Sequence, residues 1–474
     1  MILPLVFLGL AVASQDTLRL SLPEAVTLAL RDADEVKRAN ADVAITDAQV
    51  TTSRAGALPQ LRLTGTYNHV FANARARAVN QVFNQPNTYN VNANLSQTLF
   101  QGGREFASWR AARRVREAAR LTAGETRAEV AVGVLRAYLQ ASLAERVEHI
   151  RGENLVLASH RVQQSEQLFT AGRVARYDVL RSRVERANLE PLVIQARNDR
   201  EIALLDLRRL LNLPPEAPIR LTTTIDSTSV PLILAAASQD GADGSDRASV
   251  RAAELTARAR RDAIAAARAD WLPTISVFFQ SGVQAFPQSG FPPGRGVATT
   301  TCIDIPADPA TNRPARRECT TSQNGGWFGD RSMGVNFSWP LFDGFRAKGA
   351  IDLAQAQLQV AEIALAQERE AVALEVARAR AELSRSRAVF AARRQTVTEA
   401  GEAFRLASLR YSRGIGTSLE VSDSQLQLLI SQTDEAQSAV DLYLAAADLA
   451  RALGSPIPLP GGSVISPQTT ANAP

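Results

Sequence analysis

Two cysteines and three histidines are the residues of this 474-residue chain best suited to bind a metal or form a cross-link. Cys302 and Cys319 share one stretch rich in Gly, Pro and Thr, with no adjacent His or further Cys to complete a metal site. In an exported protein such a pair predicts a disulfide. His149 and His160 are eleven residues apart on one predicted helix. Because that spacing corresponds to about 16 Å along the axis, they cannot share a metal ion.

Catalytic and nucleotide-binding motifs are missing from the sequence. It contains no Walker motif, no dinucleotide fingerprint and no Ser/His/Asp set. The glycine-rich segment 290–296 lacks the strand-to-helix context of a phosphate-binding loop. We therefore predict a protein that is not an enzyme and has no catalytic, cofactor-binding or metal-binding residues.

The charge pattern argues against nucleic-acid binding. The net charge is only +5, and Arg supplies almost all the basic residues, since Lys occurs only at Lys37 and Lys348. The Arg residues are spread among Glu and Asp along predicted helices, which is typical of solvated or salt-bridged faces.

The N-terminus has the character of an export signal. Residues 1–14 form a short apolar run that includes Ala11-Val12-Ala13, the small-x-small pattern of a signal-peptidase site. Spanning a bilayer takes about 20 apolar residues, and no later segment has 18 in succession. A membrane-embedded form would therefore have to be a closed β-barrel.

An internal duplication organises the chain. Each of three motif pairs is separated by 242 residues (342 − 100, 414 − 172 and 456 − 214). The pairs are Leu99-Phe100-Gln101-Gly102 with Leu341-Phe342-Asp343-Gly344, Phe169-Thr170-Ala171-Gly172 with Tyr411-Ser412-Arg413-Gly414, and Leu211-Asn212-Leu213-Pro214 with Leu453-Gly454-Ser455-Pro456. Upstream, Leu58-Pro59 recurs as Leu272-Pro273, 214 residues on (272 − 58). The 28 additional residues (242 − 214) therefore lie in the loop that holds both cysteines.

Helical and strand-like segments alternate in each repeat. Ala-, Leu-, Arg- and Glu-rich stretches with apolar residues three and four apart predict helices; these are 21–57, 103–170, 176–212, 246–270, 343–411 and 418–453. The two longest would each reach about 100 Å, which is typical of coiled coils or helical arrays. Four short stretches alternate with period two, for example Tyr89, Val91 and Leu95 on one face against Asn90, Asn92 and Asn94 on the other.

This alternation indicates barrel strands with lipid outside and water inside. A soluble half-buried sheet would also alternate. Four strands cannot close a barrel, and an open edge is not tolerated in lipid, so several chains must share one barrel. Two chains would give a filled eight-stranded barrel, whereas three would give twelve strands and an aqueous lumen, which the small polar inner faces favour.

At this point the chain resembles the TolC-like outer-membrane efflux protein family over roughly residues 17–456. The resemblance rests on Leu-Phe-x-Gly at the strand-to-helix junctions and on Tyr/Phe-x-x-Gly followed by Asp/Glu-Val at the hairpin tips. It implies an α+β membrane protein: a trimeric 12-stranded antiparallel β-barrel, four strands per chain, on a long periplasmic α-helical coiled-coil tunnel. The expected segments are the signal peptide (1–14), a first leading helix (15–57), barrel strands 1–2 (58–101), a first long hairpin (102–213), an equatorial girdle or linker (214–245), a second leading helix (246–271), barrel strands 3–4 with a long extracellular loop (272–342), a second long hairpin (343–455) and a disordered tail (456–474).

The resemblance also assigns roles at the tunnel tip. Glu420 and Asp423 match two acidic positions that form an aperture ring in the family; we call them the aperture pair. Positions i and i+3 share a helix face, so three chains would place six carboxylates around a narrow lumen. The alternative is that both are ordinary acidic residues near a helix N-terminus, where the dipole favours them.

The other tip positions match the family in part. Asp178 and Tyr411 match two of three gate-latch residues, but Gly416 stands where the family has an Arg. Arg413 could replace it, as could Arg173 or Arg176. Gly172 and Gly414 are expected to form the turns, and the segments 171–177 and 413–418, with Gly172, Arg173, Gly414 and Gly416, are the expected adaptor contacts.

The function implied is the exit duct of a tripartite efflux pump, a passive channel in the outer membrane of a Gram-negative type of cell. Its partners would be two further copies of the chain, outer-membrane lipid, a periplasmic adaptor (membrane fusion) protein and an inner-membrane transporter of RND or ABC type. No cofactor is expected. The exit duct of a type I protein secretion system uses the same fold and remains an alternative. A trimeric adhesin would instead carry passenger repeats outside the barrel.

Overall fold

The computed structural model describes residues 18–72, 86–223, 243–287, 290–291, 297–306, 314–324, 326–458 and 464–465. The predicted signal peptide (1–14) lies outside the described residues. The chain forms two compact units. We call one the strand unit (Asp47–Arg113 and Arg258–Gln359) and the other the helical unit (Met1–Thr46, Arg114–Ala257 and Val360–Pro474).

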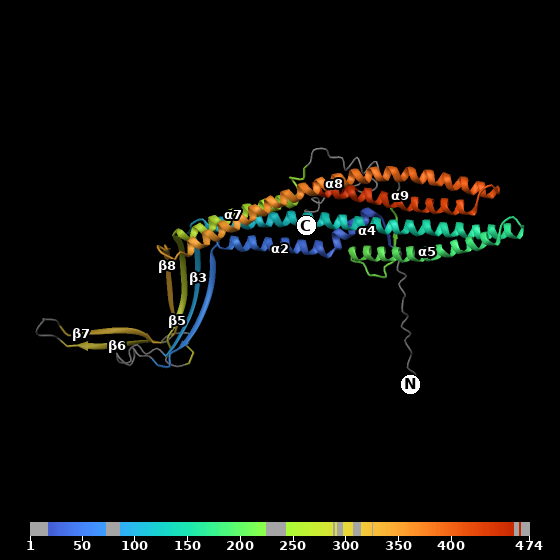
Figure 1. The fold of residues 1–474 in the computed structure, drawn as a ribbon. Coiled ribbons are helices and arrows are strands. Elements are labelled where there is room, and N and C mark those ends of the chain that lie inside the picture. Colours follow the sequence, from blue (N-terminus) through green and yellow to red (C-terminus); the bar gives the residue numbers. More distant parts are fainter. Residues whose placement is uncertain are drawn as a thin grey trace, which may run out of the picture. The chain divides into compact units, whose positions relative to one another are not determined.

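The strand unit contains a four-stranded antiparallel sheet in the order β2-β3-β5-β8. Its strands are β2 (Gln60–His69), β3 (Asn87–Gln101), β5 (Thr274–Ala285) and β8 (Phe328–Ser338), which run side by side in Figure 1. The four stretches predicted from alternation therefore do form strands. Residues of like polarity lie on the same face, since Asn94 pairs with Gln280, and Val91 with Val283.

A second hairpin was not predicted. β6 (Val297–Ile305) pairs with β7 (Arg316–Asn324) inside the segment expected to be a loop. Both strands are rich in Thr and charged residues, so neither carries the apolar alternation by which the other strands were recognised. Cys302 lies directly opposite Cys319 in this pairing, and a disulfide joins them.

Two long helical hairpins dominate the fold. α4 (Arg104–Thr170) is followed by α5 (Arg176–Leu210), and α8 (Arg346–Ser412) by α9 (Ser418–Leu453). Both α4 and α8 have 67 residues, as the duplication requires. Figure 1 shows each hairpin's second helix lying alongside its first. Across the residues that the structure describes, no helix combines the length and apolar character needed to cross a membrane.

The leading helices differ in detail from the prediction. Instead of one helix over 21–57, the chain forms α1 (Leu22–Asp32) and α2 (Asp34–Ala55), because Ala33 adopts an extended conformation (ψ 137°). α1 begins with a capping box, in which Glu24 accepts hydrogen bonds from the backbone and side chain of Ser21. The second leading helix, α7 (Ala248–Arg268), continues into a 3-10 turn, η1 (Ala269–Trp271).

The main core lies in the helical unit, around the fully buried Tyr138 and Tyr443. The Tyr138 hydroxyl donates to the carbonyl of Leu20 (2.9 Å) and accepts from the backbone N–H of Thr223 (3.0 Å). It thereby fixes β1 (Leu18–Leu20) and β4 (Ile219–Leu221), which pair in parallel. The strand expected after Pro218 in the girdle is therefore present, whereas β1 is too short to show a pattern in the sequence.

The C-terminal segment is ordered further than we predicted. β9 (Ile457–Pro458) pairs with β10 (Val464–Ile465) within the segment expected to be disordered from residue 456. The Ile457 side chain is fully buried and belongs to the main core, and this burial holds the segment after α9.

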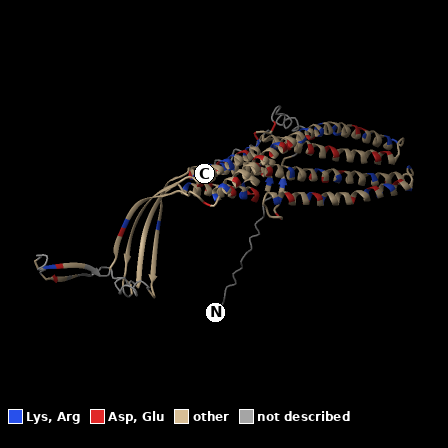
Figure 2. Cartoon of the chain, turned by 60° about the vertical axis from the view of Figure 1, so that its left-hand side comes forward, with Lys and Arg blue, Asp and Glu red and all other residues tan. Residues whose placement is uncertain are grey.

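Charged residues of both signs alternate along the helices, whereas the four strands of the sheet carry few, as Figure 2 shows. Many of the Arg residues form ion pairs between helices; Arg197 and Arg200 of α5, for example, both contact Glu148 of α4. This agrees with the interpretation of the basic residues as salt-bridged helix faces.

Candidate functional site at the hairpin tips

The two turns at the hairpin tips have the same backbone structure. Gly172 and Gly414 adopt positive φ angles (70° and 78°), which glycine tolerates best. In the first turn the N–H groups of Gly172 and Arg173 return to the carbonyls of Phe169 and Leu168. The second turn repeats both bonds at positions 242 residues later. The duplicated glycines thus end α4 and α8 and let α5 and α9 turn back.

Asp178 holds the first tip and also contacts the second. One carboxylate oxygen accepts from the N–H of Ala175 (3.2 Å), which caps α5. The other accepts from the hydroxyl of Ser418, the first residue of α9 (3.2 Å). This is a direct link between the two hairpin tips within one chain.

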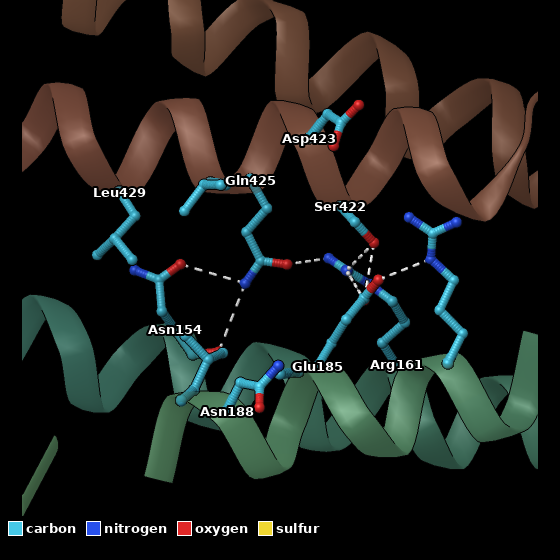
Figure 3. Close-up of a pocket in the computed structure, with 12 residues that line it drawn as sticks. Asn154, Arg161, Glu185, Asn188, Ser422, Asp423, Gln425 and Leu429 are labelled. Carbon is cyan, nitrogen blue, oxygen red and sulfur yellow. Dashed lines mark hydrogen bonds and ion pairs between the residues drawn. The ribbon is translucent and has the colours of Figure 1, made fainter. Parts of the chain in front are cut away.

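The aperture pair lies in the first two turns of α9, and both side chains are exposed in the single chain. Thr417 caps the helix by accepting from the N–H of Glu420 (3.3 Å). The Glu420 carboxylate also forms an ion pair with Arg410 of α8 (3.8 Å). Asp423 follows one turn later, and Figure 3 shows it apart from the hydrogen-bonded groups of the neighbouring pocket.

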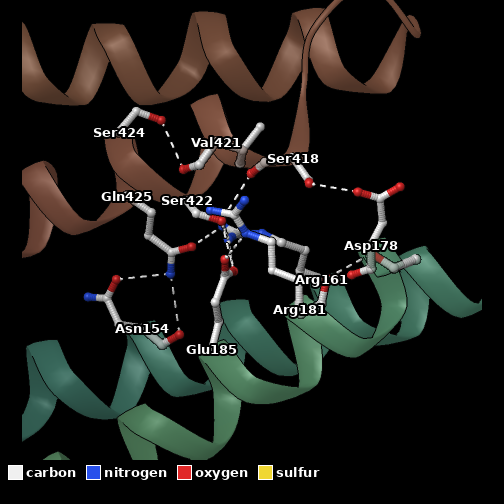
Figure 4. A network of polar contacts seen from close by, with 12 residues as sticks. Asn154, Arg161, Asp178, Arg181, Glu185, Ser418, Val421, Ser422, Ser424 and Gln425 are labelled. Atoms are coloured by element: carbon white, nitrogen blue, oxygen red, sulfur yellow. Dashed lines mark hydrogen bonds and ion pairs between the residues drawn. The ribbon is translucent and has the colours of Figure 1, made fainter. Parts of the chain in front are cut away.

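A buried polar network joins α4, α5 and α9 behind the tips; Figures 3 and 4 show it from two sides. We define the tip network as Asn154, Arg161, Arg181, Glu185, Ser422 and Gln425. The Arg161 guanidinium lies at its centre and contacts Glu185 (3.4 Å), the Ser422 hydroxyl (3.1 Å) and the Gln425 carbonyl.

The remaining contacts of the tip network satisfy its other polar groups. Glu185 accepts from Ser422 (2.7 Å) and from Arg181 (3.0 Å). The Gln425 amide donates to the side chain of Asn154 (3.1 Å). Because these bonds cross from the first hairpin to α9, separating the two hairpins at this level would break several of them together.

Burial makes this network electrostatically demanding. The Arg161 side chain is only 11% exposed, and burial lowers the pKa of its guanidinium while the adjacent Glu185 opposes that change. The hydrogen bond to Glu185 raises the pKa of Arg181. One carboxylate therefore serves two guanidinium groups, beside a pocket of about 260 Å³ that Asp423 also lines.

The single chain does not bring all the predicted latch residues together. Among the described residues, no hydrogen bond or ion pair joins Asp178 to Tyr411 or Arg413, and Arg413 is exposed. The Tyr411 hydroxyl is buried without a hydrogen-bond partner in the described part of the chain. The printed partner of Asp178 on the second hairpin is Ser418 instead.

Gly416 is required by close packing. A Cβ atom there would lie 3.0 Å from the Cβ of Arg410 and 3.1 Å from the backbone nitrogen of Tyr411. An arginine at this position would require the last turn of α8 to move. Arg173, by contrast, is exposed at the first turn and free to take part in a contact outside the chain.

Sequence reasoning missed the tip network and Arg410. Arg161, Glu185 and Gln425 occupy helix positions like many others in this Arg- and Glu-rich chain, and no motif marks them. Within the described ranges there is no group of three or more His, Cys, Asp or Glu residues that could hold a metal ion.

The four-stranded sheet with two open edges and the long helical hairpins define a class of protein, the outer-membrane channel built from several chains. The sequence matches the profile of the family described as "Outer membrane efflux protein" over residues 25–213 and 245–455. The chain belongs to this family. The predicted fold class is confirmed: a trimeric β-barrel in the outer membrane, with four strands from each chain, and an α-helical tunnel in the periplasm.

Individual relatives agree with this membership. Protein CyaE of Bordetella pertussis is 26% identical over 443 residues, covering 92% of this chain and 84% of CyaE. Among solved structures, the outer membrane protein VceC of Vibrio cholerae is 20% identical with a TM-score of 0.70, covering 92% of this chain and 96% of VceC. The CmeC outer membrane channel of Campylobacter jejuni is 15% identical with a TM-score of 0.70, covering 91% of this chain and 85% of CmeC.

Proposed function

We propose that this protein is the exit duct of a tripartite efflux pump, which carries small toxic compounds from an inner-membrane transporter and a periplasmic adaptor to the exterior. The observation that carries the proposal is the match to the outer membrane efflux protein family in both repeats. In this proposal the duct is passive, and the transporter, of RND or ABC type, supplies the energy.

The hairpin tips are the proposed docking surface for the adaptor. Segments 171–177 and 413–418 are short, and most of their side chains are exposed, including Arg173, Arg413 and Ile415, which is 70% exposed. The rigid caps formed by Asp178 and Thr417 hold these segments in one conformation. An adaptor would therefore meet a preorganised surface, which reduces the entropy that binding costs.

The aperture pair is proposed to select ions at the narrow end. In the trimer, α9 would present two carboxylates from each chain to the lumen, and such a ring attracts cations and repels anions. The ion pair of Glu420 with Arg410 weakens part of this charge, so we propose that Asp423 contributes more to the field than Glu420 does.

Site-specific photo-crosslinking in living cells tests the proposal. A photoreactive residue at Ile415 or Arg173 should capture an adaptor, whereas one at Arg387, exposed on α8 and 25 residues before its end (412 − 387), should capture much less. Mass spectrometry of the complex then identifies the transporter. Recovery of a small-molecule transporter supports the efflux duct, and recovery of a protein-exporting ATPase would assign the chain to type I secretion instead. Equal capture at all three positions would refute docking at the tips.

A further inference from the structure

The two edge strands of the sheet, β2 and β8, have no partner strand within the described chain. Sheet edges with free N–H and C=O groups cannot face lipid, so each must pair with another strand. Since β2 and β8 run in opposite directions, β8 of one chain can pair with β2 of a second copy as an antiparallel neighbour. The question is which residues face each other in that seam.

The internal duplication extends to the hydrogen-bonding register. In the first repeat Gln60 pairs with Ser96, and in the second Thr274 pairs with Ser338. These are the same pair after the sequence offsets are added, since 274 − 60 is 214 and 338 − 96 is 242. The structure therefore treats β5 as the equivalent of β2, and β8 as the equivalent of β3, residue by residue.

The β3–β5 pairing within one chain is then a template for the seam between chains. We propose that β8 pairs with the second copy's β2 in the register of β3 with β5. Asn94 lies opposite Gln280 in the template, so the offsets put Asn336 (94 + 242) opposite Thr66 of the second copy (280 − 214). The same step puts Ser338 opposite Thr64.

The faces of the two strands agree with this register. Asn336 and Thr66 both belong to the polar face, and the neighbouring pair Val335 and Tyr67 both belong to the apolar face. A slip by one residue would place polar side chains against apolar ones throughout the seam. Val335 and Tyr67 are 67% and 57% exposed in the single chain, and an aromatic residue opposite a β-branched one is a favourable cross-strand pair.

The strand-to-helix junction supports the same partner. At Gly102, a Cβ atom would lie 2.9 Å from atoms of Ala269 and Leu272 in the same chain. Its equivalent, Gly344, has a similar backbone conformation (φ 69° against 59°) but no described atom within 4 Å of that position. The offsets assign Ala55 and Leu58 of the second copy to this place.

There they would cover a groove of about 370 Å³ between Trp271, Trp339 and Phe345. Leu58 is 48% exposed in the single chain and would become buried.

Cysteine pairs distinguish this register from a slip by two residues, which would also keep the faces matched. A disulfide needs Cα atoms about 4.4–6.8 Å apart, whereas residues displaced by two across a ladder are about 7–8 Å apart. Asn336→Cys is combined with Thr64→Cys, Thr66→Cys or Asn68→Cys, in the full-length chain with both native cysteines replaced by Ser. The protein is oxidised in outer membranes and separated by denaturing electrophoresis.

The pair N336C/T66C should convert the monomer band to a covalent trimer, and the other two pairs should leave monomer as the main species. The matched positive control is N94C/Q280C, the same pair within one chain, which should form an internal disulfide without a change in mass. Strongest cross-linking with Thr64→Cys or Asn68→Cys, or none with any of the three in assembled protein, would overturn the proposed register. If N336C/T66C fails to assemble, S338C/T64C tests the same register.

Discussion

Removing the charge of Glu185 should loosen the hairpin tips far more than removing the charge of a neighbouring, better-formed ion pair. Two carboxylates link α4 to α5 near the tips. Glu185 contacts Arg161 at 3.4 Å, with side chains 27% and 11% exposed, whereas Glu166 contacts Arg183 at 2.6 Å, with side chains 43% and 59% exposed. Distance alone would predict the larger effect for Glu166.

Burial reverses that order. Loss of one partner from a buried pair costs about 3–5 kcal/mol, because the remaining charge stays desolvated. Glu185 keeps a quarter of its surface in water, and Gln can still accept hydrogen bonds, so for Glu185→Gln we expect about 2–3 kcal/mol. An exposed pair contributes about 0.2–1 kcal/mol, so for Glu166→Gln we expect about 0.5 kcal/mol.

Hydrogen-exchange mass spectrometry of the assembled protein measures both effects in the same peptides. At 1.36 kcal/mol for each factor of ten, Glu185→Gln should speed exchange about 30–150-fold in the tip segments, and Glu166→Gln about twofold. The two variants also differ in where the effect spreads. Glu185 bonds to Ser422, so exchange in the first turns of α9 should rise with Glu185→Gln and stay unchanged with Glu166→Gln.

Equal acceleration by the two variants, or a Glu185→Gln effect confined to α5, would refute the reasoning. The first result would mean that burial of Arg161 does not control the stability of the tips. The second would mean that the tip network does not connect the first hairpin to α9.

Three further outcomes are expected. The double variant E420A/D423A should weaken the cation selectivity of single channels in planar bilayers, and unchanged selectivity would exclude the aperture ring while leaving the duct intact. Gly414→Ala should destabilise the second tip by about 1 kcal/mol because its φ is positive, whereas Gly401→Ala, inside α8, should stabilise the helix by about 1 kcal/mol; hydrogen exchange again measures both, and a like sign would contradict the argument. Thiol labelling of the denatured, unreduced protein should find no reactive cysteine, because the two cysteines are joined across the β6–β7 hairpin.

The sequence predicted those parts of the fold that repeat. The four barrel strands alternate in polarity, and the long hairpins carry three- and four-residue apolar spacing, so each could be recognised locally. The duplication then fixed the equivalence of the two halves, down to the paired glycines Gly172 and Gly414 at the tips. Elements without such a pattern were missed: the three-residue β1, the break at Ala33 and the Thr-rich β6–β7 hairpin.

The candidate site divides in the same way. Glu420, Asp423, Asp178 and Tyr411 were found because they follow a motif at fixed spacing from a turn. Which residue Asp178 meets could not be found in that way, since Ser418 lies 240 residues away in the sequence (418 − 178) and marks no motif.

The sequence by itself determined the repeat, the faces of the strands and the positions of the turns, because each depends on residues close together in the chain. Only the tertiary structure decided that Arg161, Glu185 and Gln425 form one buried network. Three helices from two hairpins supply its members, and the need to satisfy a desolvated charge arises only when those helices pack together.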